Sequence, residues 1–358
     1  MATERNLSPL KQPVAVGSTD EQKKYSSILQ GKATNALTKT SKKSMELDPF
    51  TLTGRTTRDG VQVFLENYNS LSLNVQTHKV LDALTIKLTS NFPFGAKATA
   101  EQIASHRIVE ISVDEYMQLC GLSDRKEARK QLKEAIHTLY NISLEWDEIS
   151  YIVPEGKKKR VKQENHYSVR LTDAKIEAKE NPLRRGKVVF AFSYTLAQYL
   201  SKAYIMQYPD KLLSINAKYN PHSYYMGRKI TEHHNMNIGK ENANRIAVST
   251  LLKALPDMPT YADVMSKYNG SLTQKIIMPF ERDLIALKDT YGILASWKYC
   301  NSKGEPLTEE QIESYSYDVW EKWLIEFELT GYPDQSERLA KIEERKKIAT
   351  KKKNQSKQ

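Results

Sequence analysis

The sequence predicts an α+β fold made of two similar units, and three features of the chain lead to this prediction. Residues 111–146 read as a helix, a tight turn, a second helix with one basic face, and then a strand. A basic loop and a returning strand follow. The same order of helix, strand, loop and strand occurs again between residues 271 and 329. Together these features predict two tandem winged helix-turn-helix domains.

The N-terminal stretch differs in composition from the rest of the chain. Residues 1–58 are rich in Ser, Thr, Lys, Gln and Asn and contain few aromatic residues. Such a segment buries too little apolar surface to offset its conformational entropy, so we expect a disordered arm. The remaining boundaries are a first winged-helix domain at 59–200, a second at 201–332 and a basic tail at 333–358.

Capping residues predict the limits of the first helix pair. Ser112 can cap the first helix, Gly121 can take the left-handed conformation that ends it, and Ser123 can cap the second helix. That second helix has an apolar stripe opposite a basic face, a pattern that an ordinary amphipathic helix with a solvated basic side would also show. The stripe is Ala128, Leu132, Ile136 and Leu139, and the basic face is Arg125, Lys126, Arg129, Lys130 and Lys133.

A long basic loop predicts the wing of the first unit. A strand that ends at Trp146 is followed by this loop and then by a strand that begins near Lys187. A loop of this size is unusual in a compact domain and indicates disorder or ordering by a partner. Its basic residues would contact DNA phosphates, although a solvated lysine-rich loop is the commoner fate of such runs. They are Lys157, Lys158, Lys159, Arg160, Lys162, Arg184 and Arg185.

The second unit repeats the spacing of the first. A helix that begins at Ser271 precedes Ile293–Trp297, which matches Ile142–Trp146 in the distance from Ile to Trp. Pro279 interrupts this helix and would cost about 3 kcal/mol in a helix interior, so we expect the helix to restart there with Pro279 in its first turn. The closing strand is expected at Trp320–Leu329.

Charge and composition favour a polyanionic partner. The chain has 54 Lys and Arg against 43 Asp and Glu. The tail from residue 335 to 358 would add sequence-independent affinity for phosphates, or would only solubilise the chain. Cys120 and Cys300 are too isolated for a disulfide scaffold or a zinc finger. Without a membrane-length apolar run or a signal core, we expect a cytoplasmic protein with no membrane partner.

Motifs of the common enzyme classes are missing from the sequence. There is no phosphate-binding loop G-x-x-x-x-G-K-[ST], no dinucleotide fingerprint and no nucleophile turn. His233 and His234 are adjacent on a predicted helix and point about 100° apart, which suits them poorly for chelating one metal. We therefore expect a non-enzymatic protein without a metal or other cofactor. A nickase or recombinase with an unrecognised catalytic tyrosine is an alternative.

Four segments resemble the iteron-type replication initiators of plasmids and related mobile elements, which carry two winged-helix domains in tandem. They are residues 111–146, 187–200, 218–234 and 271–287. The resemblance implies binding to repeated origin sites on double-stranded DNA, help in strand opening and recruitment of host replication proteins. It also implies a monomer that activates, a homodimer that can repress its own promoter, and association with plasmid or nucleoid DNA. A tandem winged-helix transcriptional regulator is the alternative.

By position, the resemblance makes Ser123–Tyr140 and Ser271–Lys288 the DNA-reading helices. In the major groove Arg or Lys can pair two ways with guanine, and Gln with adenine. The candidate base-reading residues are Arg125, Arg129, Lys130, Thr273, Gln274, Lys275 and Arg282. Further cations are expected to contact phosphates and to position each unit without choosing sequence. Besides the residues of the wing loop, these are Lys126, Lys133, Lys298 and Lys303.

Overall fold

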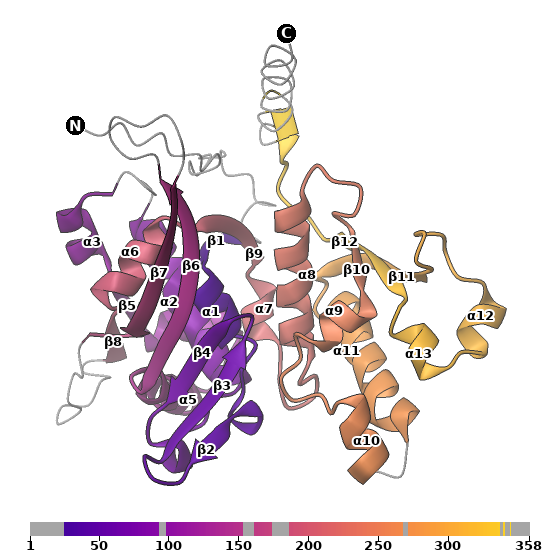
Figure 1. Ribbon diagram of the computed structural model, residues 1–358, viewed down its shortest axis with the longest axis horizontal. Coiled ribbons are helices and arrows are strands. Elements are labelled where there is room, and N and C mark those ends of the chain that lie inside the picture. The colour runs from indigo at the N-terminus through magenta and orange to yellow at the C-terminus, as the bar shows by residue number, and fades with distance from the viewer. Residues whose placement is uncertain are drawn as a thin grey trace.

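A computed structural model of the chain describes residues 25–92, 98–152, 161–173, 186–267 and 271–336, together with 339, 340 and 344. Figure 1 shows two groups of helices and strands, the first coloured indigo to magenta and the second orange to yellow. Helix α8 (Ser223–Asn237) stands between them. Both groups combine helices with a small antiparallel sheet, as the predicted α+β class requires.

The first unit is built on a five-stranded antiparallel sheet with the strand order β2-β3-β4-β6-β7. These strands are β2 (Glu46–Asp48), β3 (Thr53–Arg58), β4 (Val61–Leu65), β6 (Ile142–Ile152) and β7 (Val161–Arg170). Alternation turns Val61, Val63 and Leu65 to one buried face, where Trp146 lies opposite Val61. This face shares one core with three helices, α2 (Val75–Asn91), α4 (Val113–Cys120) and α5 (Arg125–Leu139).

Helices α4 and α5 form the helix-turn-helix that the sequence predicts. The hydroxyl of Ser112 accepts the N–H of Glu115 at 3.0 Å, and Gly121 ends α4 with φ at 63°, as expected. The predicted cap of α5 is one residue too early, because the carboxylate of Asp124 rather than Ser123 accepts the first N–H groups. A carboxylate at this position has the stronger attraction for the positive helix end.

The predicted wing is wrong in its returning strand. β6 pairs with β7, which begins at Val161, whereas Lys187 opens β8 (Lys187–Ala191), which pairs with β5 (Ile108–Ser112). β7 escaped recognition because it is mostly polar and exposed, while the apolar alternation of β8 suits a returning strand equally well. Helices α3 (Ala100–His106) and α6 (Tyr194–Ser201) lie beside this second pair of strands (Figure 1).

The predicted disordered arm is wrong for residues 25–58, and the expected domain boundary at 58 falls inside the first unit. Strand β1 (Tyr25–Gln30), helix α1 (Lys32–Leu37) and a 3₁₀ turn (Lys42–Ser44) precede β2 and β3. Ile28, Leu29, Ala33, Ala36 and Leu37 are fully buried in the core. Strand β1 packs on α2, and α1 packs on β4 and β6. An average over composition does not reveal these contacts. Residues 1–24 lie outside the described part of the chain.

A connector leads from the first unit to the second. Strand β9 (Tyr204–Pro209) follows α6 and pairs with β1, so that the N-terminal strand lies against the connector in antiparallel register. The short helix α7 (Lys211–Ser214) comes next, and then α8. Most of α8 is buried, because it has the first unit on one side and the second on the other.

The second unit has a three-stranded sheet with the order β10-β12-β11. Its strands are β10 (Arg245–Ala247), β11 (Leu294–Cys300) and β12 (Leu324–Leu329), and its helices are α9 (Val248–Leu252), α10 (Tyr261–Lys267), α11 (Met278–Asp289), α12 (Glu309–Glu313) and α13 (Tyr317–Trp320). The predicted closing strand therefore starts too early, since Trp320 ends α13 and its indole is buried against Phe280. Of the predicted basic tail, residues 345–358 lie outside the described part.

The predicted helix restart at Pro279 is confirmed. α11 begins at Met278 with Pro279 in its first turn, and a π-helical turn (Thr273–Ile277) leads into it. The N–H of Met278 accordingly bonds to the carbonyl of Thr273, five residues earlier. Because proline lacks an N–H, the hydrogen-bond pattern of a regular α-helix cannot continue through this position.

Candidate nucleic-acid interface

Helix α5 presents a cationic face to solvent above an apolar underside. Arg129, Lys130 and Lys133 are exposed, whereas Ala128 and Leu132 are fully buried. Within the described part of the chain, none of the three cations forms an ion pair with a carboxylate. A surface helix of this kind keeps its charges hydrated and available, so it can approach a polyanion without first breaking internal contacts.

Arg125 and Lys126 lie in the first turn of the same helix, and the two differ in their surroundings. The guanidinium of Arg125 is paired with the carboxylate of Asp114 on α4, and both side chains are more than half exposed. Gly186, just before β8, lies beside this guanidinium, since a Cβ at this position would be 3.5 Å from Nη2 of Arg125. Lys126 is exposed, with no ion pair among the described residues. Arg125 is therefore held in one place and would have to share or leave Asp114 to bond a base.

The base-reading candidates of the second unit fall on two consecutive segments. Thr273, Gln274 and Lys275 are exposed on the π-helical turn, and Arg282 is half-exposed on α11. The Nε of Arg282 donates to Oδ1 of Asp283 at 2.8 Å. Three consecutive residues already point in different directions around a helix, and the π-helical turn changes their angle to Arg282 further, so the four do not share a single face.

Asp283 is fully buried and fixes α11 against α8. Its Oδ2 accepts the backbone N–H of His222 at 2.6 Å, just before α8 begins, and its carbonyl accepts the hydroxyl of Ser223 at 2.9 Å. Burial lowers the pKa of His222, with the facing carboxylates of Asp283 and Asp257 acting in the opposite direction. Arg282 is thus positioned by a carboxylate that the rest of the unit holds rigidly.

Two apolar residues on the outer face of α11 were not among the sequence candidates. Met278 is 58% exposed and Ile285 is 46% exposed. They lie four residues before and three residues after Arg282, which places all three on one side of the helix. Their spacing to Arg282 was visible in the sequence, but buried and exposed apolar positions alternate too closely there to be told apart. Apolar side chains on a reading helix can contact the methyl group of thymine.

The predicted phosphate-contacting residues of the second unit have different surroundings. Nζ of Lys298 on β11 lies 2.9 Å from Glu326 on β12, and Nε of Arg245 lies 2.8 Å from the same carboxylate. The bonds to Lys298 and Arg245 hold the pKa of Glu326 below its ordinary value. Lys303 is exposed in the turn after β11, where its N–H bonds to Asn301. Lys298 is therefore ion-paired although half-exposed, whereas Lys303 has no ion pair among the described residues.

Most of the predicted wing cations of the first unit lie outside the described residues. Lys162 is exposed at the start of β7 and pairs with Glu164. The other predicted contacts lie outside the described residues, and they are Lys157, Lys158, Lys159, Arg160, Arg184 and Arg185.

The two adjacent histidines have structural partners. His233 bonds to the carbonyl of Asn242 at 3.0 Å, and His234 bonds to the side chain of Asn244 at 2.8 Å. No group of three or more His, Cys, Asp or Glu side chains suited to a metal ion occurs among the described residues. Nor is any described helix long and apolar enough to cross a membrane.

A comparison with protein families identifies the type of domain in the first unit. Residues 66–209 match the family model described as Initiator Replication protein, WH1. The chain carries an initiator WH1 domain. The match spans the helix pair α4–α5 together with the hairpin β6–β7. It confirms the winged-helix class, the predicted relationship to replication initiators and the role of a replication initiator.

Other comparisons are more distant. In the comparison with curated proteins, no sequence matches this chain. A crystal structure of domains 2 and 3 of RctB aligns with 83% of this chain and 98% of its own, at 11% identity and a TM-score of 0.40. A second RctB structure, also of domains 2 and 3, aligns with 79% and 95%, at 10% identity and a TM-score of 0.35.

Proposed function

We propose that this initiator binds repeated origin sites on double-stranded DNA with both of its units. The observation that carries the proposal is the face of α5, where Arg129, Lys130 and Lys133 are exposed and free of internal ion pairs among the described residues. In a helix-turn-helix the second helix lies in the major groove, and α5 has that position behind α4 and Gly121.

Contacts to bases and contacts to phosphates would come from different parts of the surface of α5. Arg129 and Lys130 can donate to O6 and N7 of guanine once α5 lies in the groove. Lys126 and Lys133 lie near the two ends of this exposed face and would bond phosphates, which position the helix without choosing a sequence. Each phosphate contact releases counterions, so binding would weaken as salt rises.

In the second unit, the π-helical turn and α11 would enter a further groove of the same duplex. Gln274 can pair two ways with adenine, and Arg282 with guanine, while Met278 can contact a thymine methyl group. The hydroxyl of Thr273 can bond to either purine. Since Asp283 holds Arg282, its guanidinium would need little reordering on binding.

Beyond DNA binding, we infer a non-enzymatic role in initiation. Once bound to its repeats, the protein would assist strand opening and recruit host replication proteins, and a homodimer would repress its own promoter. Its place would be on plasmid or nucleoid DNA in the cytoplasm. Incubation with supercoiled origin DNA and Mg²⁺ should leave the circles intact, and nicked circles would instead favour the nickase alternative.

The direct test is a nuclease footprint on the DNA flanking the gene, made with wild type and with Arg129→Ala. We expect protection of repeated sites, and for the variant a loss of about 1–3 kcal/mol on the repeat with little change on unrelated DNA. An equal loss on both DNAs would exclude base reading by Arg129. A transcriptional regulator would show the same footprint, but the gene and its repeats together would then fail to maintain a plasmid.

A further inference from the structure

A buried ion pair joins the two units. The carboxylate of Asp82 on α2 faces the guanidinium of Arg228 on α8, with Nε–Oδ2 at 3.0 Å and Nη2–Oδ1 at 3.3 Å. The side chains are 2% and 5% exposed. The hydroxyl of Tyr224, one turn earlier on α8, donates to Oδ2 of Asp82 at 2.7 Å. This two-point contact fixes the angle between the helices as well as their distance.

A second helix contact crosses the same junction. Nδ1 of His78 on α2 lies 3.1 Å from the hydroxyl of Tyr225 on α8, and both residues are buried. Burial, together with the nearby Arg228, lowers the pKa of His78 to about 3, so the imidazole is neutral. Arg228 therefore has Asp82 as its buried countercharge without competition from a second cation at this point.

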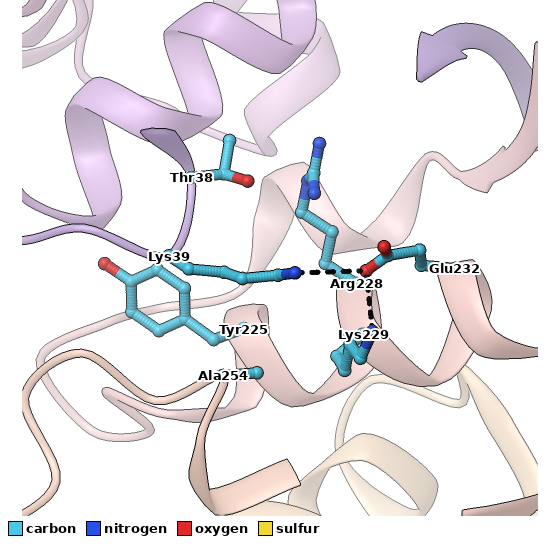
Figure 2. A pocket seen from close by; sticks show the side chains of 7 residues that line it. All are labelled: Thr38, Lys39, Tyr225, Arg228, Lys229, Glu232 and Ala254. Carbon is cyan, nitrogen blue, oxygen red and sulfur yellow. Dashed lines mark hydrogen bonds and ion pairs between the residues drawn. The ribbon is translucent and has the colours of Figure 1, made fainter. Parts of the chain in front are cut away.

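The N-terminal segment closes the junction from a third side, as Figure 2 shows. Glu232 on α8 lies 3.9 Å from Nζ of Lys39 and 3.2 Å from Nζ of Lys229. The amide of Asn35 on α1 donates to Glu232 at 3.4 Å, and its oxygen accepts from Arg228 at 3.5 Å. The small pocket drawn in Figure 2 is lined by three cations, Lys39, Arg228 and Lys229, and by Glu232, which pairs with both lysines.

This segment also bonds to the second unit at two further places. The hydroxyl of Tyr25 on β1 donates to the carbonyl of Thr330, directly after β12, at 2.9 Å. The hydroxyl of Ser41 donates to Asp257, between α9 and α10, at 2.8 Å. Meanwhile the N–H of Leu29 bonds to Thr89 of α2 at 2.8 Å. Residues 25–44, which we call the N-terminal clamp, therefore bond to both units at several separate points.

This junction continues without a break to the two DNA-reading helices. α2 packs on α5 in the first unit, and α8 packs on α11 in the second. On the second side, Asp283 of α11 also bonds to the backbone at the start of α8. The path α5–α2–α8–α11 thus consists of packed helices joined at its centre by Asp82 and Arg228. Buried ion pairs contribute little net stability but can select one geometry over others.

We propose that the Asp82–Arg228 junction and the N-terminal clamp hold α5 and α11 at one separation, so that the protein measures the spacing between two half-sites. This inference rests on the proposed function, since it assumes that both helices read DNA. A duplex presents the same groove face once every 10–10.5 base pairs, so a rigid pair of reading helices would accept one spacing and its whole-turn multiples at most.

The first test needs no DNA. Spin labels are attached at Lys133→Cys on α5 and Lys288→Cys on α11, both exposed positions, and the distance between them is measured by pulsed electron resonance. We expect one narrow distance distribution in the otherwise wild-type protein. In Asp82→Leu/Arg228→Met the distribution should broaden. Apolar groups of similar size fill the junction, but they lack the directional hydrogen bonds that fix the angle between α2 and α8. This pair leaves no lone buried charge, so the chain should still fold.

The matched control is Glu66→Leu/Arg170→Met. It removes an ion pair of 2.7 Å that lies within the first unit and is partly exposed. Its distance distribution should stay narrow. A narrow distribution in Asp82→Leu/Arg228→Met as well, or a broad one in the unmutated protein, would overturn the proposal whether or not the chain binds DNA.

The second test uses duplexes carrying the footprinted repeat, with five base pairs inserted between its two halves. The insertion turns one half-site to the opposite face of the duplex and should weaken binding of the wild type about 100-fold, because the second contact is lost. The junction variant should lose less than about tenfold, since its units can rotate to follow the insertion. An equal loss in both proteins would overturn the spacing role. Failure of the wild type to select any repeat would instead overturn the proposed function itself.

Discussion

The two helices that we propose read DNA, α5 and α11, have the same place in their units but different surfaces. α5 is regular and carries five basic and two acidic residues. The π-helical turn with α11 carries three basic and three acidic residues and exposes Met278 and Ile285. A net positive helix attracts any DNA, whereas a neutral one with apolar contacts gains mainly from the right bases. The difference predicts that the first unit supplies affinity and the second supplies selectivity.

Helix anchoring differs as well, and breaking it should have the largest effect. Asp283→Ala removes a fully buried carboxylate that bonds the start of α8 and positions Arg282. We expect a loss of about 3 kcal/mol in the free energy of unfolding, because buried donors lose their acceptor. The exposed cap of α5 is the matched comparison, and Asp124→Ala should cost only about 1 kcal/mol. Denaturant titration of both variants measures the difference, and equal losses would contradict it.

The affinity of the first unit is tested by its phosphate contacts. Lys126→Ala/Lys133→Ala should weaken binding to cognate and unrelated DNA alike, and should reduce the slope of log affinity against log salt by about 1.8. The matched change in the second unit is Gln274→Ala/Met278→Ala. It should lower affinity for the repeat only, and leave the salt slope unchanged. Fluorescence anisotropy at several salt concentrations would separate the two patterns, and a shared pattern would remove the proposed division.

Sequence alone predicts those parts of the fold that depend on local periodicity. The apolar stripe of α5, the turn at Gly121 and the restart at Pro279 are all set by residues within a few positions of each other. The N-terminal clamp could not be predicted in this way. β1 pairs with β9, which lies 174 to 184 residues later in the chain, and its few apolar residues become significant only when that partner is present.

The candidate DNA interface shows the same limit of prediction from local sequence. Exposure of Arg129 and Lys130 follows from helical spacing, and it was predicted. The ion pair that holds Arg125 to Asp114 and the one that holds Lys298 to Glu326 depend on neighbouring elements of the fold. Pairing of β8 with β5, which displaced the expected wing strand, likewise reflects a choice between distant partners. Local pattern identifies which residues face outward, but tertiary contacts decide which of them are free.

A buried lysine gives the first unit a dependence of its stability on pH. Lys79 on α2 is 5% exposed and donates to the carbonyl of Ile215, and burial lowers its pKa from 10.5 to about 8. Between about pH 8 and 10 the unfolded chain keeps a proton that the folded chain releases, so stability should rise with pH by about 1–2 kcal/mol. In Lys79→Met this rise should vanish. The free energy of unfolding, measured for both proteins from pH 8 to 10, checks this prediction. If the rise persists in Lys79→Met, a group other than Lys79 causes it.

The smallest expected effect concerns Glu326, an acidic residue on β12 that pairs with two cations on the neighbouring strands. Glu326 binds both Lys298 and Arg245, so Glu326→Gln should free two cations beside the turn that carries Lys303. Because exposed pairs contribute little, folding stability should change by less than about 1 kcal/mol. Non-specific DNA affinity should increase and its salt slope should steepen by about 1, which makes the second unit more like the first.

Glu328→Gln on the same strand is the control, because Glu328 bonds only the hydroxyl of Ser296 among the described residues. If Glu326→Gln and Glu328→Gln behave alike, general charge rather than the release of Lys298 and Arg245 would explain any gain.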